Sequence, residues 1–451
     1  MADLRRTRKI ASLATPIALS MGAQVAMALI SVIMVGRLGD AALASVGVGA
    51  AVFTMLLGAL YGLETAVQAM VARRTGGDGV GLRAAMGEIL GDAAPFAIAG
   101  ALVMAGGVCL AAPSIIALAS KDPQVIRDGV GYLYGVSPMI LIMGLNVLFS
   151  GCWNGAGMPK YSFLASVVQA PCDVLFNYLL IFGPFGFPRM ETAGAGLAAT
   201  LSGLTALCVH LVVARKAIGF ENLFRRLPDL SRVRTIIAIG GPVSVQQVTA
   251  YLGSYALLLI VGQAGVQSLA IANVLIVLML VPMILATAMG IAGAILVGQA
   301  LGQGDAVDAR RWGWDAGRVG GLAILALSVS AILFPEAILG GYIHNPHTVA
   351  MGVLPLRLVA IGICFDAVGR ILAYASRGAG ATGLVTMVSL ACQWGVLLPL
   401  AWLAAGPLGF GLVGVSAAQM VVFALESALM IFLWTRGGWS RSSVLARAGA
   451  A

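Results

Sequence analysis

The sequence predicts an all-α polytopic membrane protein with twelve transmembrane helices in two pseudo-symmetric lobes of six. The chain of 451 residues is 60% hydrophobic and only 10% charged, which is more apolar surface than a soluble core can hide. Apolar runs long enough to cross a hydrocarbon layer about 30 Å thick recur along the whole chain. In addition, the second half of the chain repeats the proline and glycine pattern of the first half.

Charged or Pro- and Gly-rich breaks divide the chain into apolar runs. The first run follows MADLRRTRKI and is too long for a signal peptide, and it lacks a small-residue cleavage site, so we expect a permanent span. The runs are uniformly apolar, whereas an outer-membrane barrel requires alternating segments. We expect spans near 13–35, 46–72, 89–112, 130–152, 161–183, 193–214, 236–263, 272–298, 316–341, 350–376, 382–405 and 411–435.

Lysine and arginine set the expected orientation. With the N-terminus inside, 22 of the 27 basic residues fall on the cytoplasmic side, as the positive-inside rule requires. We therefore expect a multi-pass protein of the bacterial inner membrane with both termini in the cytoplasm. Topology and anionic lipid explain the net charge of +9, so no nucleic-acid partner is needed.

The internal repeat bears most directly on function. Residues 16–79 shifted by 226 positions lie on 242–305 without a gap, and later pairs are offset by 222 or 223. We expect an N-terminal lobe at 1–214, a cytoplasmic linker at 215–235 and a C-terminal lobe at 236–451, both lobes inserted in the same orientation. The aligned pairs include Pro16 with Pro242, Gly39 with Gly265, Gly76 with Gly302, Pro113 with Pro335, Pro123 with Pro346 and Gly157 with Gly380.

Two such lobes favour a transporter, in which rocking exposes a midplane site to each side in turn. A channel is less favoured because no filter sequence or charged ring is apparent. The chain contains no HExxH, GxSxG or GxxxxGK[ST] motif, so we expect neither an enzyme nor a nucleotide-driven pump. The absence of an extramembrane domain disfavours a scaffold or receptor.

Four acidic residues lie near the membrane midplane, where an ionisable side chain is by default a functional candidate. They are Glu64, Asp173, Asp366 and Glu426. Asp366 precedes Arg370 by four residues, on the same helical face. One interpretation is that the Asp366 carboxyl alternately holds and releases a proton or a cation. The other is that it forms a structural ion pair with Arg370. Each of the other three is a second candidate for such a site or a helix-packing group.

Neutral polar residues add candidates for lining a substrate cavity. Gln246 and Gln247 cannot both face one direction, so we expect at least one of them to join helices. His344 and His347 have HxxH spacing but lack nearby carboxylates or thiolates other than Glu336, and the six cysteines show no CxxC or CxxH spacing, so no metal site, cofactor or disulfide is predicted. The cavity candidates are Gln24, Ser31, Asn177, Gln246, Gln247, Tyr251, Arg370 and Glu426.

Several segments match, in order and spacing, those of a known family: ATPIALSMGAQVAMALISVIMVGRLGDAALA, GCWNGAG, NYLLIFGPFGFP, TAGAGLAA, GGPVSV, VGQALGQGD and SRGAGAT. On these segments rests a resemblance, across essentially the whole length of the chain, to the MATE multidrug and toxin extrusion transporters. It implies the two-lobed fold of the MATE and MOP superfamily, and export of amphipathic, mostly cationic compounds in exchange for H⁺ or Na⁺.

The resemblance also carries over to particular residues. Asp366 matches the span-10 aspartate of the C-lobe cation site in NorM-type members, and Asn177 matches a span-5 asparagine, while Asp173 stands where many members have another asparagine. The family's span-1 aspartate falls on Ser31. Its span-7 glutamate falls on Ala250, and Arg370 replaces a residue that is commonly neutral.

We therefore expect a secondary active multidrug antiporter working by alternating access, with Asp366, Asp173 and Glu64 as ion-coupling residues. We expect a monomer in the bilayer whose partners are small amphipathic molecules. One alternative is a dedicated exporter of a natural product or siderophore, anionic ones included, with Arg370 contacting it. A flippase for a lipid-linked oligosaccharide would be expected to carry several basic cavity residues, whereas this sequence offers essentially one.

Overall fold

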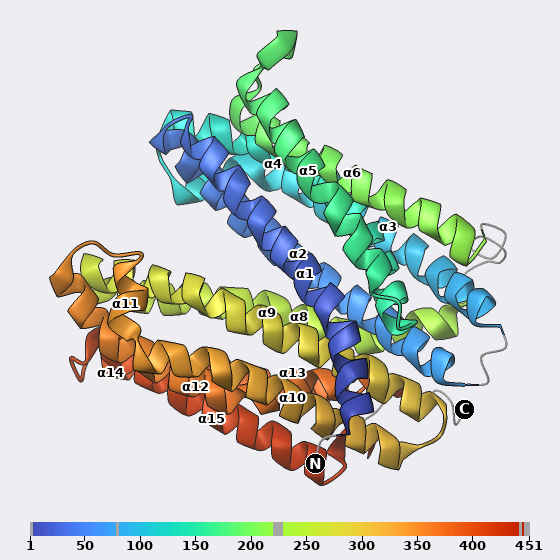
Figure 1. Cartoon of the computed structure of the whole chain (residues 1–451). Coiled ribbons are helices and arrows are strands. Elements are labelled where there is room, and N and C mark those ends of the chain that lie inside the picture. The colour runs from blue at the N-terminus through green and yellow to red at the C-terminus, as the bar shows by residue number, and fades with distance from the viewer. Residues whose placement is uncertain (1–2, 78–80, 220–228, 442–443, 446–451) are drawn as a thin grey trace. The chain divides into compact units, whose positions relative to one another are not determined.

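The computed structural model describes residues 3–77, 81–219, 229–441 and 444–445, and within these ranges it contains helices and no strands (Figure 1). Twelve helical segments in the described part of the chain are long and apolar enough to cross a membrane, as the sequence predicts. The first half contains α1 (Leu4–Gly36), α2 (Asp40–Gly76), α3 (Leu82–Ala119), α4 (Pro123–Gly155), α5 (Lys160–Phe182), the 3₁₀ turn η1 (Pro184–Gly186) and α6 (Glu191–Ala217).

The second half follows the same order with two interruptions. It contains α8 (Leu230–Gln263), α9 (Val266–Gly302), α10 (Ala306–Leu333), the short α11 (Pro335–Gly340), α12 (Pro346–Gly378), α13 (Thr382–Leu390), the π-helical η2 (Ala391–Leu397), α14 (Leu398–Ala405), α15 (Gly411–Thr435) and α16 (Gly438–Arg441).

The turns of the two halves repeat, as the sequence alignment requires. Gly39 has a φ of 116° and its repeat partner Gly265 has a φ of 106°. Each precedes the second helix of its half, where a side chain would be strained. Gly157 and Gly380 form a second matched pair, with φ of 73° and 85°. The glycine pattern of the repeat therefore follows from backbone geometry.

The predicted ninth span differs from the observed helix. We expect it at 316–341, but α10 runs from Ala306 to Leu333 and a separate short helix follows. Phe334 leaves the helical region, with φ −123° and ψ 49°, directly before Pro335, whose ring disfavours a helical residue in front of it. The apolar sequence continues through 341, so hydropathy alone does not reveal this break.

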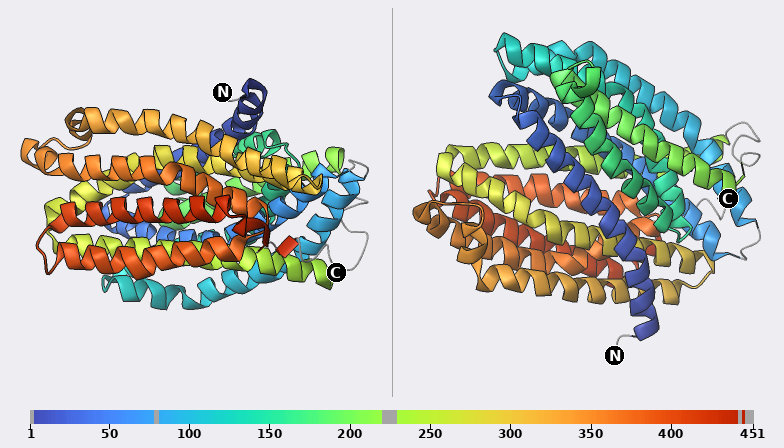
Figure 2. Two further views of the ribbon diagram at one scale, coloured as in Figure 1. Left: turned by 90° about the horizontal axis from the view of Figure 1, so that it is seen from below. Right: turned by 45° about the horizontal axis from the view of Figure 1, so that its top comes forward.

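The helices gather into two compact units. Unit 2 consists of Leu19–Ser244, and unit 1 consists of Met1–Ala18 with Val245–Ala451. These bounds differ from the expected lobe boundaries at 214 and 236. The reason is that α1 and α8 each begin in one unit and continue in the other. Both helices continue without interruption, and α1, in dark blue, can be followed along its length in Figure 2.

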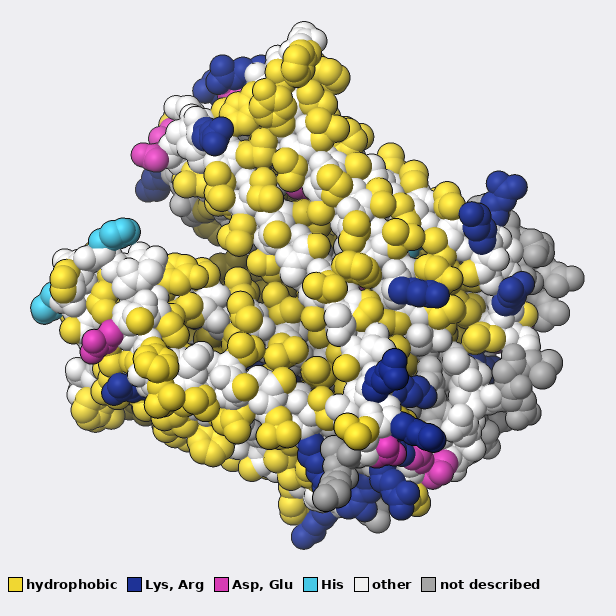
Figure 3. Space-filling view, in the orientation of Figure 1, with side chains coloured by type: hydrophobic (Ala, Val, Ile, Leu, Met, Phe, Trp, Pro, Cys, Tyr) yellow, Lys and Arg dark blue, Asp and Glu magenta, His cyan; other side chains and the backbone are white. Residues whose placement is uncertain are grey.

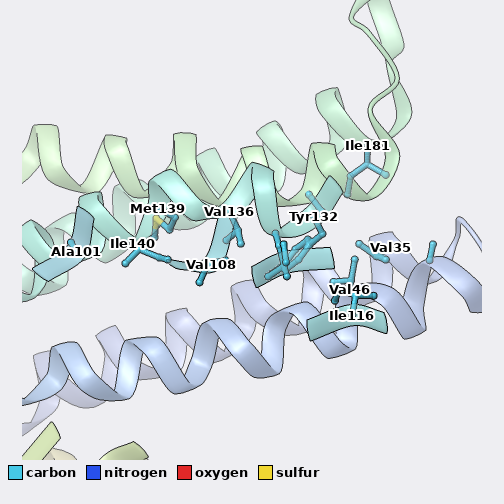
Figure 4. Close-up of a cluster of buried hydrophobic side chains, with 14 of the residues drawn as sticks. Val35, Val46, Ala101, Val108, Ile116, Tyr132, Val136, Met139, Ile140 and Ile181 are labelled. Atoms are coloured by element: carbon cyan, nitrogen blue, oxygen red, sulfur yellow. The ribbon is translucent and has the colours of Figure 1, made fainter. Parts of the chain in front are cut away.

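Unit 2 is built around α4, which packs against α2, α3 and α6. An apolar cluster in this unit brings together side chains from all six helices α1 to α6, among them Val46, Ile116, Tyr132 and Ile140 (Figure 4). Close approach of α4 and α6 depends on glycine: a Cβ on Gly196 would lie 2.5 Å from the carbonyl oxygen of Tyr132. Small residues at such a crossing are typical of helix packing in lipid.

Unit 1 is built in the same way around α12, which packs against α9, α10 and α15. Its apolar cluster includes Ile271, Leu339, Val359 and Val415. Within α13–η2–α14 the chain passes through a π-helical segment just before Pro399, the place where a proline ring removes a regular helical hydrogen bond.

Many large apolar side chains remain exposed. Leu110, Leu118 and Leu322 are 87%, 92% and 68% exposed, and hydrophobic atoms cover much of the visible surface along the helices in Figure 3. A surface of this kind is incompatible with water and suits a bilayer. The chain is therefore a multi-pass membrane protein.

Candidate ion- and substrate-binding residues

The most complete polar cluster in unit 2 surrounds Asp173. This residue is 6% exposed and lies on α5, one helical turn before Asn177, which is 1% exposed. The Asn177 side-chain amide donates to the Asp173 carboxylate at 3.0 Å and to the Asp173 backbone carbonyl at 2.9 Å. A spacing of four residues places both side chains on one face of the helix.

Two hydroxyl groups from other helices complete the cluster. Ser202 on α6 donates to one carboxylate oxygen of Asp173 at 2.8 Å, and Ser31 on α1 donates to the other at 3.3 Å. Asn177 also donates to the Ser31 hydroxyl at 3.1 Å. Three helices thus direct polar groups at one buried carboxylate.

The chemistry of this cluster suits a proton or a hard cation. Its members supply carboxylate, hydroxyl and amide oxygens, the ligand types that such cations prefer. The Asn177 side-chain oxygen is buried without a partner in the assigned amide orientation. No Lys, Arg or His forms an ion pair with Asp173 among the described residues. The carboxylate is therefore held by neutral groups only.

The predicted acid in unit 1 is arranged differently. Asp366 is 6% exposed, and the Arg370 guanidinium binds one of its carboxylate oxygens through both Nε and a terminal nitrogen. The Arg370 side chain is 32% exposed and lies 6.0 Å from the centre of the Phe423 ring. The i,i+4 pair, one of the two alternatives that the sequence left open, is present, so Asp366 already has a cation beside it.

Glu426 lies near this pair, although it comes from α15. Its carboxylate accepts a hydrogen bond from Ser389 of α13 at 2.6 Å, and it interacts electrostatically with both Asp366 and Arg370. The cluster therefore contains two acidic groups and one guanidinium. Ser389 was not among the sequence candidates.

Gln246 joins three helices of unit 1. Its side-chain oxygen accepts from the Arg377 guanidinium of α12 at 3.0 Å and from the Thr386 hydroxyl of α13 at 3.5 Å. Gln246 is 8% exposed, whereas the adjacent Gln247 is half-buried. In the next turns of α8, the Ala250 backbone carbonyl accepts from Gln393 in the π-helical segment at 3.1 Å.

The remaining candidates stand apart from these clusters. Gln24 is exposed, while Glu64 and Tyr251 are half-buried. Their side chains form no hydrogen bond or ion pair with any residue in the described part of the chain. Glu64 is nonetheless close to α4, since a Cβ on Gly151 would lie 2.5 Å from the Glu64 backbone carbonyl oxygen.

The structure thus unites Ser31, Asp173 and Asn177, and it adds Ser202, which the sequence analysis did not single out. A serine on an apolar helix usually bonds its own backbone or packs against a neighbour. The sequence around Ser202 carries no feature that distinguishes it from such a residue.

Among the described residues no three His, Cys, Asp or Glu side chains converge as metal ligands. All six cysteines are free.

Comparison with known proteins identifies the family. The MatE family model matches residues 16–179 and again residues 242–403, so both halves of the repeat are recognised separately. The chain is 28% identical over 417 residues to a probable multidrug resistance protein NorM of Bradyrhizobium diazoefficiens, covering 89% of this chain and 87% of that protein. It is 29% identical over 438 residues to a protein of the same description from Pseudomonas aeruginosa, covering 92% and 86%.

Solved structures agree in fold. A MOP superfamily transporter from Pyrococcus furiosus superposes with a TM-score of 0.87 at 19% identity, over 97% of this chain and 96% of that one. An outward-facing multidrug resistance transporter of the MATE family gives a TM-score of 0.86 at 19% identity, with the same coverage. With its two matched halves, its twelve apolar helices and these relatives, the chain belongs to the MatE family of membrane transporters.

Proposed function

We propose that this transporter is a multidrug exporter that moves amphipathic, mostly cationic compounds out of the cell in exchange for H⁺ or Na⁺. The curated relatives named above are described as multidrug resistance proteins, which supports this class of substrate. The excess of Lys and Arg on one set of connections supports an inner-membrane protein with both termini in the cytoplasm. A monomer is sufficient for this mechanism, because each chain holds both halves.

We assign ion coupling to the Asp173 cluster, and one observation carries this assignment. Within the described part of the chain Asp173 is a buried carboxylate held only by neutral donors, so a proton or Na⁺ arriving there neutralises a charge that no described cation balances. Asp366 has its own guanidinium partner, so an incoming cation must first compete with Arg370. Asp366 is therefore the second candidate, and Glu64, which has no polar partner among the described side chains, is the third.

Coupling follows from the difference between the charged and the neutralised cluster. With the ion absent, the carboxylate requires the donors from α1, α5 and α6 to remain in place. With the ion bound, the same donors are no longer required in that arrangement, and the helices are free to change their packing. Such a change is useful for transport only if it alters substrate affinity, as reciprocal linkage demands.

The test is dye efflux in everted membrane vesicles, with a pH gradient and a Na⁺ gradient imposed separately. Asp173→Asn should abolish the gradient-dependent part of efflux, while Glu336→Gln, which alters an exposed acid outside the clusters, should leave it intact. The double change Asp366→Asn with Arg370→Gln removes the second candidate together with its guanidinium partner, so that neither position keeps an unpaired charge, and it should retain ion dependence. If efflux lost its ion dependence in the double variant but kept it in Asp173→Asn, ion coupling would have to be assigned to Asp366 of unit 1 instead.

A second candidate function is export of a specific anionic natural product or siderophore. Arg370 favours it, because about a third of its side chain is exposed and could reach a carboxylate or phosphate group. Arg370→Ala should then abolish transport of anionic compounds while cationic dyes are still exported. A lipid-linked oligosaccharide is a weaker candidate, because its cavity would be expected to carry several basic residues and this sequence offers essentially one, Arg370.

A further inference from the structure

The first helix of each half is shared between the two units in the same way. Unit 1 contains the chain up to Ala18 and unit 2 contains it up to Ser244, so the two changes of unit lie 226 residues apart, the offset of the internal repeat. We call residues 4–18 of α1 the first arm and residues 230–244 of α8 the second arm. Each arm thus belongs to the unit formed mainly by the other half of the chain.

Charged side chains hold the first arm in unit 1. The Arg6 guanidinium pairs with Asp315 of α10 at 2.6 Å and also pairs with Asp308, one face of α10 supplying both acids. Arg6 lies 4.2 Å from the centre of the Trp312 ring. The Trp312 indole N–H donates to the Asp308 carboxylate at 2.7 Å, which fixes the acid and the ring together.

A corresponding set of charges holds the second arm in unit 2. The Arg232 guanidinium pairs with Asp92 of α3 at 2.9 Å and with Glu88 at 3.0 Å. Asp92 is only 6% exposed, and it also accepts the backbone N–H of Asp229 at 2.9 Å. The carboxylate of Asp92 therefore binds both a side chain and the backbone at the start of α8.

The two sets of ion pairs occupy equivalent positions of the repeat. Arg6 and Arg232 are 226 residues apart, as are Pro16 and Pro242, while Asp92 and Asp315 are 223 apart, the offset that relates Pro123 to Pro346. The two halves share little sequence beyond Pro and Gly positions, yet both retain an arginine on the arm and an aspartate on the third helix of the other half.

We propose that Arg6 and Arg232 are positioning residues that fasten each arm to the unit of the opposite half. Because the arms continue as α1 and α8 into the other unit, any rearrangement of one unit is transmitted to its neighbour through these two helices. Without the ion pairs, each arm would detach and the units would move with less coupling. The inference concerns how the units are linked, and it is independent of which ion or compound is transported.

Hydrogen–deuterium exchange of the purified full-length protein tests the local part of the inference. Arg6→Ala should accelerate exchange in residues 4–15, and Arg232→Ala should accelerate it in residues 230–241, each by about fivefold to thirtyfold. Matched controls are Arg8→Ala and Arg234→Ala, which alter exposed arginines that are also 226 residues apart and form no ion pair with the described residues. Equal effects of a variant and its control would overturn the proposal.

Transport measurements test the coupling. The Arg6→Ala, Arg232→Ala double variant should export a cationic dye with a maximal rate reduced about fivefold or more. The affinity of the purified protein for the dye should stay within about twofold of the wild type. This measurement is the control for folding, because a loss of fold would lower both the rate and the affinity. Exchanging the charges, Arg232→Asp with Asp92→Arg, should restore the slow exchange of the second arm. A double variant that exports at the normal rate despite loosened arms would refute the coupling role.

These outcomes are separable from those of the ion-coupling test. If the arm variants showed no faster exchange, the ion-dependent efflux test of Asp173→Asn would still stand. If Asp173→Asn kept ion-dependent efflux, the expected exchange rates of the arm variants would not change.

Discussion

Replacing Gly196 by alanine tests how closely α6 approaches α4 in unit 2. An alanine Cβ at this position would lie 2.5 Å from the Tyr132 carbonyl oxygen, 2.8 Å from the Val136 backbone nitrogen and 3.0 Å from the Gly135 carbonyl carbon. All three neighbours are backbone atoms, which cannot rotate away as a side chain can. The two helices must therefore separate by about 1 Å to restore ordinary van der Waals contact.

The magnitude follows from two opposing terms. Overpacking of a close-packed interface destabilises by about 1–3 kcal/mol, and a rigid backbone neighbour places this site near 3 kcal/mol. Alanine in a helix interior is favoured over glycine by about 1 kcal/mol. The expected net loss of unfolding free energy is therefore about 2 kcal/mol. The Thr200 hydroxyl, which donates to the Gly135 carbonyl at 2.8 Å, would lose part of its hydrogen bond as well.

Gly131→Ala is the matched control, because it changes the same interface from the α4 side. A Cβ there would lie 3.5 Å from the Cβ of Ala193, an ordinary contact, so this variant should gain about 1 kcal/mol from helix propensity. The two variants then differ by about 3 kcal/mol, or about 6–12 °C in melting temperature at about 2–4 °C per kcal/mol.

Thermal unfolding in detergent, followed by tryptophan fluorescence, measures this difference. Because α6 carries Ser202, moving α6 should also weaken its hydrogen bond to Asp173 and reduce ion-driven dye efflux in Gly196→Ala alone. If the two variants melted within about 2 °C of each other, the close approach of α4 and α6 would be refuted.

Three further predictions concern single polar groups. Trp153→Phe should lower unfolding stability by about 1–3 kcal/mol, because the Trp153 indole N–H donates to the buried His210 ring at 3.1 Å. The same change should lose less in a His210→Phe background, where the acceptor is already gone, in the same melting assay. Arg370→Gln should lower the melting temperature because it leaves Asp366 buried without its cation, and adding Asp366→Asn should recover part of the loss; a further loss instead would contradict the ion pair. The Ser231 backbone N–H holds the pKa of Asp229 below its usual range. The stability difference between the wild type and Asp229→Ala should therefore be full above about pH 4 and should disappear as the pH falls through the lowered pKa. A difference that persists at low pH would rule out the carboxylate as its source.

Hydropathy and charge were sufficient to predict the twelve spans, because a span is a local property of about 20 consecutive residues. The matched positions of Pro and Gly were sufficient to predict the repeat, because turns such as those at Gly39 and Gly265 require a backbone conformation that only glycine adopts easily. The break at Pro335 was missed because the apolar sequence continues through it. The Asp366–Arg370 pair was predictable because a spacing of four residues fixes two side chains on one helical face.

Contacts between distant parts of the chain were beyond the reach of the sequence. Ser202 meets Asp173 only because α5 and α6 pack together, and a single serine in an apolar helix gives no sign of that partner. Arg6 was counted as one of many cytoplasmic basic residues, whereas it pairs with an acid 309 positions away. Long-range pairing of this kind depends on helix rotation and register, which composition does not specify.

The shared first helices also have a consequence for biosynthesis. The first arm is synthesised before its acidic partners on α10, which follow about 300 residues later, and this interval lasts about 15–60 s at ordinary rates of translation. Until α10 has been synthesised, Arg6 at the start of α1 lacks its partners Asp308 and Asp315. Unit 1 therefore cannot be completed co-translationally from its own half, and two separately expressed halves would each emerge with one foreign segment and one missing segment.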